Sequence, residues 1–100
     1  MVAQEEHKLE IAEEILEGLD NGSRADLIVF NDDVNTFEWV IQCFIGVCEL
    51  SPEEAVEKTF YIHFNGHGVV RSGAYEQMAK MKDQLIECGL NAIVGRSREN

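Results

Sequence analysis

The sequence predicts a small α+β domain with the order β-α-α-β-α-β, in which a three-stranded antiparallel sheet packs against three helices. Three observations support this fold class. The chain of 100 residues suits one domain with one hydrophobic core. Short apolar runs bounded by turn-forming residues occur early, midway and late in the chain. Between them, apolar residues recur at helical intervals.

The first strand is expected at about Asp26 to Phe30. Its last four residues are all apolar, and Asn31-Asp32-Asp33 follows directly. Asn and Asp are residues that form turns, so the strand should end at Phe30. The polar cluster then lies at the corner between this strand and the next helix.

The first helix should run from Thr36 to about Cys48. Asn35 is the expected N-cap, and Glu38 lies three residues later, where it would complete a capping box. Apolar residues on one face of this helix are Phe37, Val40, Ile41, Phe44 and Cys48.

The second helix has clearer boundaries. Ser51 is the expected N-cap, Pro52 takes the first helical position, and two glutamates follow in the first turn. Asn65-Gly66 should end the helix with a left-handed turn. The expected inward stripe consists of Ala55, Val56, Thr59, Phe60 and His63.

The remaining elements are shorter. A second strand is expected around Gly68 to Arg71, followed by a turn at Ser72-Gly73. The third helix should span Ala74 to Cys88 and stop at Gly89, and the third strand should cover Leu90 to Val94. The predicted domain organisation is a flexible acidic extension at residues 1–25, a core at 26–94 and a frayed tail at 95–100.

Composition excludes several classes of function. Nineteen acidic residues against eight basic ones give a net charge of −11, which disfavours binding to nucleic acid or to an anionic membrane. The three cysteines form no C-x-x-C motif and are expected as reduced core residues. Apolar runs fall short of the roughly 20 residues that span a bilayer. We therefore expect a cytoplasmic protein without a cofactor.

The order and spacing of these features resemble the ClpS family. The resemblance covers roughly residues 26 to 94: an Asn-Asp-Asp block before a helix, a second helix ending in an apolar-His-x-x-Gly pattern at His63, and a third helix before a short apolar strand. It implies a monomeric, non-enzymatic adaptor. Such adaptors bind destabilising bulky hydrophobic N-terminal residues, or N-degrons, and deliver the substrate to a ClpA- or ClpC-type AAA+ unfoldase, which their N-terminal extension engages.

A free protein N-terminus offers an ammonium and a first side chain, so its recognition needs hydrogen-bond acceptors beside an apolar hole. The resemblance implies that Asn31, Asp32 and His63 bind the ammonium. Asp33 and Asn35 are expected to support the loop. The side-chain pocket implied by the resemblance consists of Phe37, Val40, Thr59, Ile62 and Leu90.

Two positions depart from the family in this pocket. Phe37 stands where a gating Met is common, and Thr59 stands where a larger Met is common. A stiffer Phe37 should crowd branched first residues such as Ile and Val. Glu76 matches an acidic position that contacts the unfoldase, and Lys80 or Lys82 is the candidate for the basic residue near it.

The same residues are also compatible with other functions. His63 and His67 have the i, i+4 spacing of a helical metal pair, but Gly66 breaks the helix between them and no third ligand lies near in sequence. Asp32, Asp33 and His63 could serve acid–base catalysis, although adjacent aspartates at such a corner are usually caps. The alternative from another class is a protein-interaction module of the ribosomal-stalk kind, which would not recognise N-termini.

Overall fold

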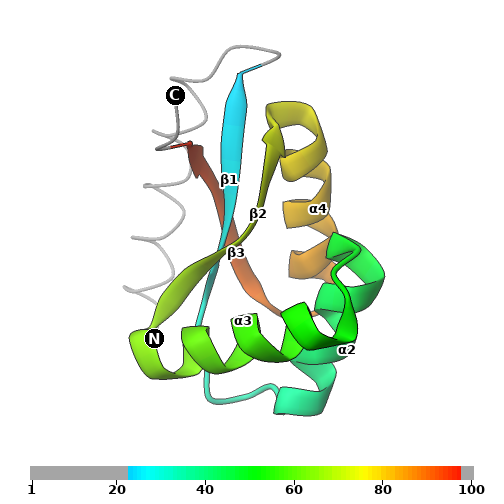
Figure 1. The fold of residues 1–100 in the computed structure, drawn as a ribbon, viewed down its shortest axis with the longest axis vertical. Helices are drawn as coiled ribbons and strands as arrows, with labels where there is room; N and C mark the ends of the chain where they lie inside the picture. Colours follow the sequence, from blue (N-terminus) through cyan, green and yellow to red (C-terminus); the bar gives the residue numbers. More distant parts are fainter. Residues whose placement is uncertain (1–22, 98–100) are drawn as a thin grey trace.

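A three-stranded antiparallel sheet with the strand order β2-β1-β3 forms the centre of the fold (Figure 1). The computed structural model describes residues 23–97. Within them the strands are β1 (Arg24–Phe30), β2 (His67–Ala74) and β3 (Asn91–Arg96). The helices are α2 (Phe37–Cys48), α3 (Pro52–Asn65) and α4 (Tyr75–Glu87). The predicted α+β order is confirmed.

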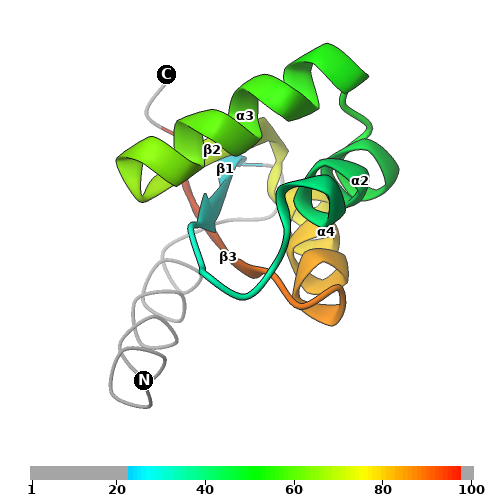
Figure 2. The same ribbon diagram turned by 90° about the horizontal axis from the view of Figure 1, so that it is seen from below.

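The core lies between the sheet and the helices. Alternate residues of β1, namely Ala25, Leu27 and Val29, are at most 2% exposed and form the inward face of the central strand. Helix α4 packs on all three strands, whereas α3 lies across β2 and against α2 (Figure 2). The largest fully buried side chains are Phe44, Leu27, Met78 and Leu85.

The strands are longer than predicted. Ser72 and Gly73 do not form a turn but pair with Asp26 and Ala25 of β1, and the Ser72 hydroxyl donates to the Asp26 carboxylate at 2.6 Å. Arg96 also pairs with Ala25, so β3 extends beyond the expected start of the frayed tail. Both expected domain boundaries thus fall inside strands. The predicted flexible extension lies, for residues 1–22, outside the described residues, as do residues 98–100 of the tail.

Helix caps agree with the sequence in one case and differ in another. Ser51 and Glu54 form the predicted capping box of α3, and the backbone and side-chain hydrogen bonds from Ser51 lower the pKa of Glu54. Asn35, however, is not the N-cap of α2. Thr36 takes that position, and its Oγ1 accepts from the Trp39 backbone N at 3.1 Å.

Three of the five residues predicted for the inward stripe of α3 are not buried. The buried residues of this helix are Ala55, Thr59 and Ile62, whereas Val56, Phe60 and His63 are exposed. Gly68 of β2 sits so close to the end of α3 that a β-carbon there would lie 2.9 Å from the Tyr61 ring. This close approach presses the face carrying Ile62 against the sheet.

Candidate functional site

The loop that joins β1 to α2 is organised by the carboxylate of Asp32. Its Oδ1 accepts from the backbone N of Val34 at 2.9 Å and of Asn35 at 2.8 Å. Its Oδ2 accepts from Asn35 Nδ2 at 3.1 Å. A carboxylate has about four acceptor positions, two on each oxygen, so Oδ2 retains capacity for another donor.

Two further hydrogen bonds fix this loop to distant elements. The Asn31 backbone N donates to the carbonyl of Gly66 at 2.9 Å, which joins the end of β1 to the end of α3. Asn35 Nδ2 donates to the carbonyl of Gly89 at 3.0 Å, which joins the loop to the turn before β3. Gly66 and Gly89 have φ values of 92° and 94°, a left-handed conformation that favours glycine. The loop, α3 and the α4–β3 turn therefore meet at one corner.

A cavity opens at this corner. Its volume is about 20 Å³, enough for roughly one water molecule. Asn31 and Asp32 are at its polar side, and the predicted pocket residues Phe37, Val40, Thr59, Ile62 and Leu90 all line it. Val29, Phe30 and Asn35 also line it and were not predicted as pocket residues. The position of Val29 and Phe30 immediately before the polar loop could have indicated them.

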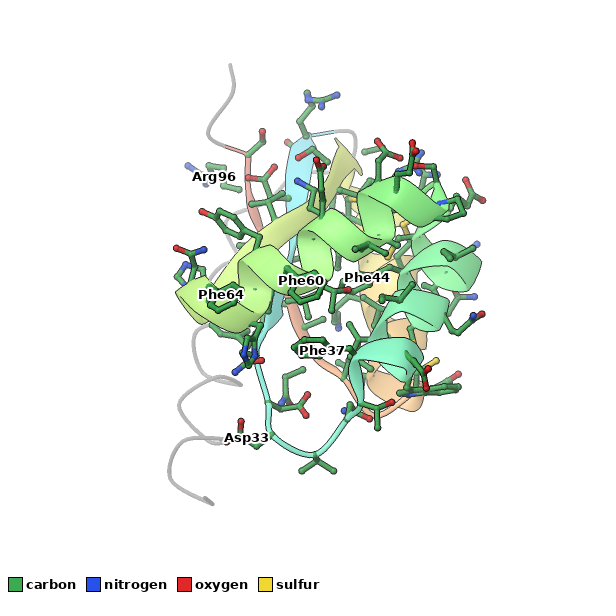
Figure 3. The ribbon with its side chains drawn as sticks, turned by 60° about the horizontal axis from the view of Figure 1, so that its bottom comes forward. Asp33, Phe37, Phe44, Phe60, Phe64 and Arg96 are labelled. Carbon is green, nitrogen blue, oxygen red and sulfur yellow. The ribbon has the colours of Figure 1, made fainter. Side chains whose placement is uncertain are left out.

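Phe37 is the most exposed apolar residue at this cavity, at 38%. Its ring meets the Phe60 ring edge-on at 5.1 Å and the His63 ring edge-on at 4.9 Å, measured between centroids. Figure 3 shows the rings of Phe37 and Phe60 next to each other between α2 and α3. Thr59 is 3% exposed, and its hydroxyl donates to the Ala55 carbonyl at 2.7 Å, so that hydrogen is already used within α3.

His63 lies next to the cavity rather than in its wall. The residue is exposed, and its ring lies against those of Phe37 and Phe64, at 4.9 Å and 5.0 Å. The structure thus brings Asn31 and Asp32 together at the cavity and places His63 one ring away, beyond Phe37.

The loop-supporting role expected of Asp33 belongs to its neighbour. The carboxylate that bonds the loop amides is that of Asp32. Asp33 is exposed and lies on the outer part of the loop, apart from the aromatic rings (Figure 3). Asn35 does join parts of the site, through its bonds to Asp32 and Gly89.

The residues considered for an unfoldase contact lie elsewhere on the molecule. Glu76 and Lys80, one turn apart on α4, line a hollow together with residues at the end of α2. Lys82 does not line it; its Nζ pairs with Asp83 Oδ1 at 2.8 Å. Of the two lysines, Lys80 therefore shares a surface with Glu76.

The cysteines are free thiols. Cys43 and Cys48 are buried, and burial is the main reason that the pKa of each rises to about 12. The Cys88 thiol contacts that of Cys43 and raises its pKa further. Within residues 23–97 no group of three or more His, Cys, Asp or Glu side chains is arranged to hold a metal ion. In the same part of the chain, no helix has both the length and the apolar character to cross a membrane.

The fold and the corner define a small binding domain in which a carboxylate and an amide stand beside an apolar cavity. The chain belongs to the ClpS family: residues 20–92 match the sequence profile described as "ATP-dependent Clp protease adaptor protein ClpS". This assigns it to the adaptors of Clp protease and confirms the resemblance predicted from the sequence.

Individual relatives agree with the family. The ATP-dependent Clp protease adapter protein ClpS of Thermosynechococcus vestitus is 35% identical over 65 residues, covering 64% of this chain and 69% of that protein. The ClpS of Clostridium acetobutylicum is 43% identical over 49 residues, covering 49% of this chain and 46% of that protein. The structure of Agrobacterium tumefaciens ClpS2 bound to L-phenylalaninamide has a TM-score of 0.66 at 18% identity, covering 76% of this chain and 99% of that one, which shows a shared fold.

Proposed function

We propose that this protein binds bulky apolar N-terminal residues of substrate proteins and delivers them to the AAA+ unfoldase of a Clp protease. The observation that carries the proposal is the position of the Asp32 carboxylate and the Asn31 side chain at the rim of an apolar cavity. A free N-terminus combines a cation with an apolar side chain, and this corner offers a partner for each. Charge-assisted hydrogen bonds of this kind are about twice as strong as neutral ones.

The bound molecule in Agrobacterium tumefaciens ClpS2 has the same chemistry as such a terminus. L-phenylalaninamide carries an α-ammonium, a benzyl side chain and a carbonyl. In this chain, Asp32 Oδ2 is the acceptor with spare capacity for the ammonium, and the side-chain carbonyl of Asn31 is the second. His63 would serve as a third acceptor through a neutral ring nitrogen.

Binding of an aromatic residue requires the cavity to enlarge. A benzene ring occupies engineered cavities of about 150 Å³, several times the volume present here. Phe37 is the residue whose movement would open the cavity, because it is partly exposed and is held by ring contacts on one side. We therefore assign Phe37 as the gate of the pocket.

A pair of peptides tests recognition. A fluorescent peptide beginning with Phe should bind with measurable anisotropy change, and the same peptide with an acetylated N-terminus should lose most of that affinity. Affinity for the free peptide should also fall as pH rises through about 7.7–8.0, where an α-amino group loses its charge. Equal binding of both peptides, or of neither, would refute N-terminal recognition and favour an interaction module of another kind.

Delivery can be separated from recognition. We propose that residues 1–22 and the hollow at Glu76 and Lys80 contact the unfoldase. The family resemblance implies this role for the N-terminal extension, and the hollow lies outside the peptide site. A protein starting at Ser23 keeps β1 complete, including the bond from the Tyr75 backbone N to the Ser23 carbonyl. It should bind the Phe peptide normally but no longer accelerate degradation of a Phe-tagged substrate by a ClpA- or ClpC-type protease. Unimpaired delivery would show that the extension has no such role.

A further inference from the structure

The sheet has a second face, turned away from α2 and α4, that carries a row of apolar side chains (Figure 2). The side chains of Leu27 and Val29 belong to the core, so that of Ile28 between them points the other way. Ile28 pairs with Ile93 of β3 and with Val69 of β2, and residues paired across antiparallel strands share a face. Ile28, Val69 and Ile93, one from each strand, are called the outer row below.

The side chains of the outer row differ in exposure. Val69 is 39% exposed, whereas Ile93 is 7% exposed although it is not part of the core cluster between the sheet and the helices. An apolar side chain that is buried outside the core belongs to a second apolar contact. The outer face of the sheet is where such a contact would lie.

A hollow of about 490 Å³ lies beside the outer row, between the strands and α3. Lys58 and Tyr61 of α3 line it together with Arg96 of β3. Of the described residues at the hollow, Asp26 is the acidic one; it is 8% exposed, and its carboxylate accepts from the Ser72 hydroxyl at 2.6 Å. In a chain with a net charge of −11, this hollow is a locally basic place. It suits a segment that is both apolar and acidic.

The N-terminal extension contains such a segment. Residues 1–22 hold seven acidic residues and one lysine. If residues 9–19 form a helix, its apolar side consists of Leu9, Ile15, Leu16 and Leu19. Its acidic side lies opposite, and Glu13, four residues after Leu9, is at the border of the two. A helix this short is marginal in water on its own, so it needs a partner for its apolar side.

The extension also has the length and the attachment point to reach the outer row. The Ser23 carbonyl accepts from the Tyr75 backbone N at 2.9 Å, which fixes the chain immediately before β1. Asp20-Asn21-Gly22 is a turn-forming sequence that allows the chain to reverse over the sheet. A helix of residues 9–19 is about 16 Å long, and a strand of the length of Arg24–Phe30 spans about 20 Å. A helix folded back at the turn therefore covers most of β1.

We propose that residues 9–19 dock as an amphipathic helix on the outer face of the sheet of the same molecule. The apolar side of the helix packs on the outer row, and its acidic border faces Lys58 and Arg96. The apolar pattern, the charge and the length of the segment each match this face. The docking is separate from peptide recognition, because the hollow and the cavity at Asp32 are lined by different residues.

Hydrogen exchange of the full chain in solution tests the docking. The backbone amides of residues 9–19 should exchange about tenfold or more slowly than those of a free peptide of the same sequence, because a docked helix keeps its hydrogen bonds closed. Val69→Glu should abolish this protection, since it removes apolar surface and adds a carboxylate that repels the acidic segment. Leu16→Glu should do the same, and its position outside the described fold separates the effect from damage to the core.

Val56→Glu is the matched control, because Val56 of α3 is 38% exposed and does not line the hollow. It should leave exchange slow. Fast exchange of residues 9–19 in the parent, protection that survives Leu16→Glu, or equal effects of Val56→Glu and Val69→Glu would overturn the docking. Protection that appears only as protein concentration rises would overturn it too, because a second copy would then be the partner. Val69→Glu should still bind the Phe peptide, so failure of the docking and failure of N-terminal recognition are distinguished.

Discussion

Replacing Asp32 by Asn tests the ammonium site without dismantling the loop. Asp32 Oδ1 accepts from two backbone amides, and the carbonyl oxygen of Asn can take over both bonds. The amide nitrogen must then occupy the place of Oδ2, because the opposite orientation would point it at those two N–H groups. A donor would thus face the incoming ammonium where the carboxylate offered an acceptor.

The magnitude follows from these contacts. A hydrogen bond to a charged group contributes about 1.5–3 kcal/mol, so Asp32→Asn should weaken binding of a Phe peptide by roughly 10- to 150-fold. Stability should change less. The bond from Asn35 Nδ2 to Oδ2, 3.1 Å long, is lost, at a cost of about 1 kcal/mol in the free energy of unfolding.

Asp33→Asn is the matched control, because it makes the same change of charge at the adjacent, exposed position. If only the overall negative field attracted the peptide, both variants would weaken binding equally. We expect Asp33→Asn to change affinity by no more than about twofold, as is usual for exposed charges. Peptide titration by anisotropy and urea unfolding of all three proteins decide the matter. Equal affinities of Asp32→Asn and the parent would refute the assignment.

Three further predictions concern other parts of the molecule. Asn35→Ala removes the 3.0 Å hydrogen bond to the Gly89 carbonyl. It should lower the free energy of unfolding by about 1–3 kcal/mol and weaken peptide binding. Unchanged peptide binding would show that this hydrogen bond does not shape the pocket. The parent should bind peptides beginning with Ile or Val about tenfold more weakly than a peptide beginning with Phe. Phe37→Ala should reduce this difference in affinity, because the gate no longer crowds a branched β-carbon. If the parent binds the Val peptide as tightly as the Phe peptide, Phe37 is not a gate. Burial raises the pKa of the Cys43 and Cys48 thiols from 9.0 to about 12, so these thiols lose their protons more readily in the unfolded chain. Their contribution to the free energy of unfolding is therefore fully present below about pH 9 and is lost as the pH rises toward 12. Urea unfolding of the parent should therefore show a steeper loss above pH 9 than unfolding of Cys48→Ala, and identical slopes would contradict it.

Those features that depend on neighbouring residues could be predicted from the sequence. The Ser51–Glu54 capping box and the left-handed Gly66 at the end of α3 are set by residues within one turn, and both are found. The ends of the strands could be predicted less well from the sequence. Ser72-Gly73 has the composition of a turn, yet it continues β2 because Asp26 and Ala25 of β1 lie opposite it. Pairing with a distant strand is a property that local composition does not encode.

Two errors at the site are displacements by one residue. One is decided by a contact between distant segments and the other by a contact within the loop. Thr36 replaces Asn35 as the N-cap of α2 because the Asn35 amide is directed to the Gly89 carbonyl, 54 residues away. Asp32 rather than Asp33 closes the loop because its carboxylate reaches the Asn35 amide.

Helix α3 shows the same effect with a functional consequence. Thr59 and Phe60 begin equally good helical stripes, one ending at Ile62 and the other at His63 and Phe64. Periodicity cannot choose between stripes that are one residue apart. The close approach of α3 to Gly68 involves Tyr61 and Ile62, and Ile62 is buried together with Thr59, whereas Phe60 is left exposed. The exposed Phe60 ring then contacts the ring of Phe37, the residue that we assign as the gate of the pocket.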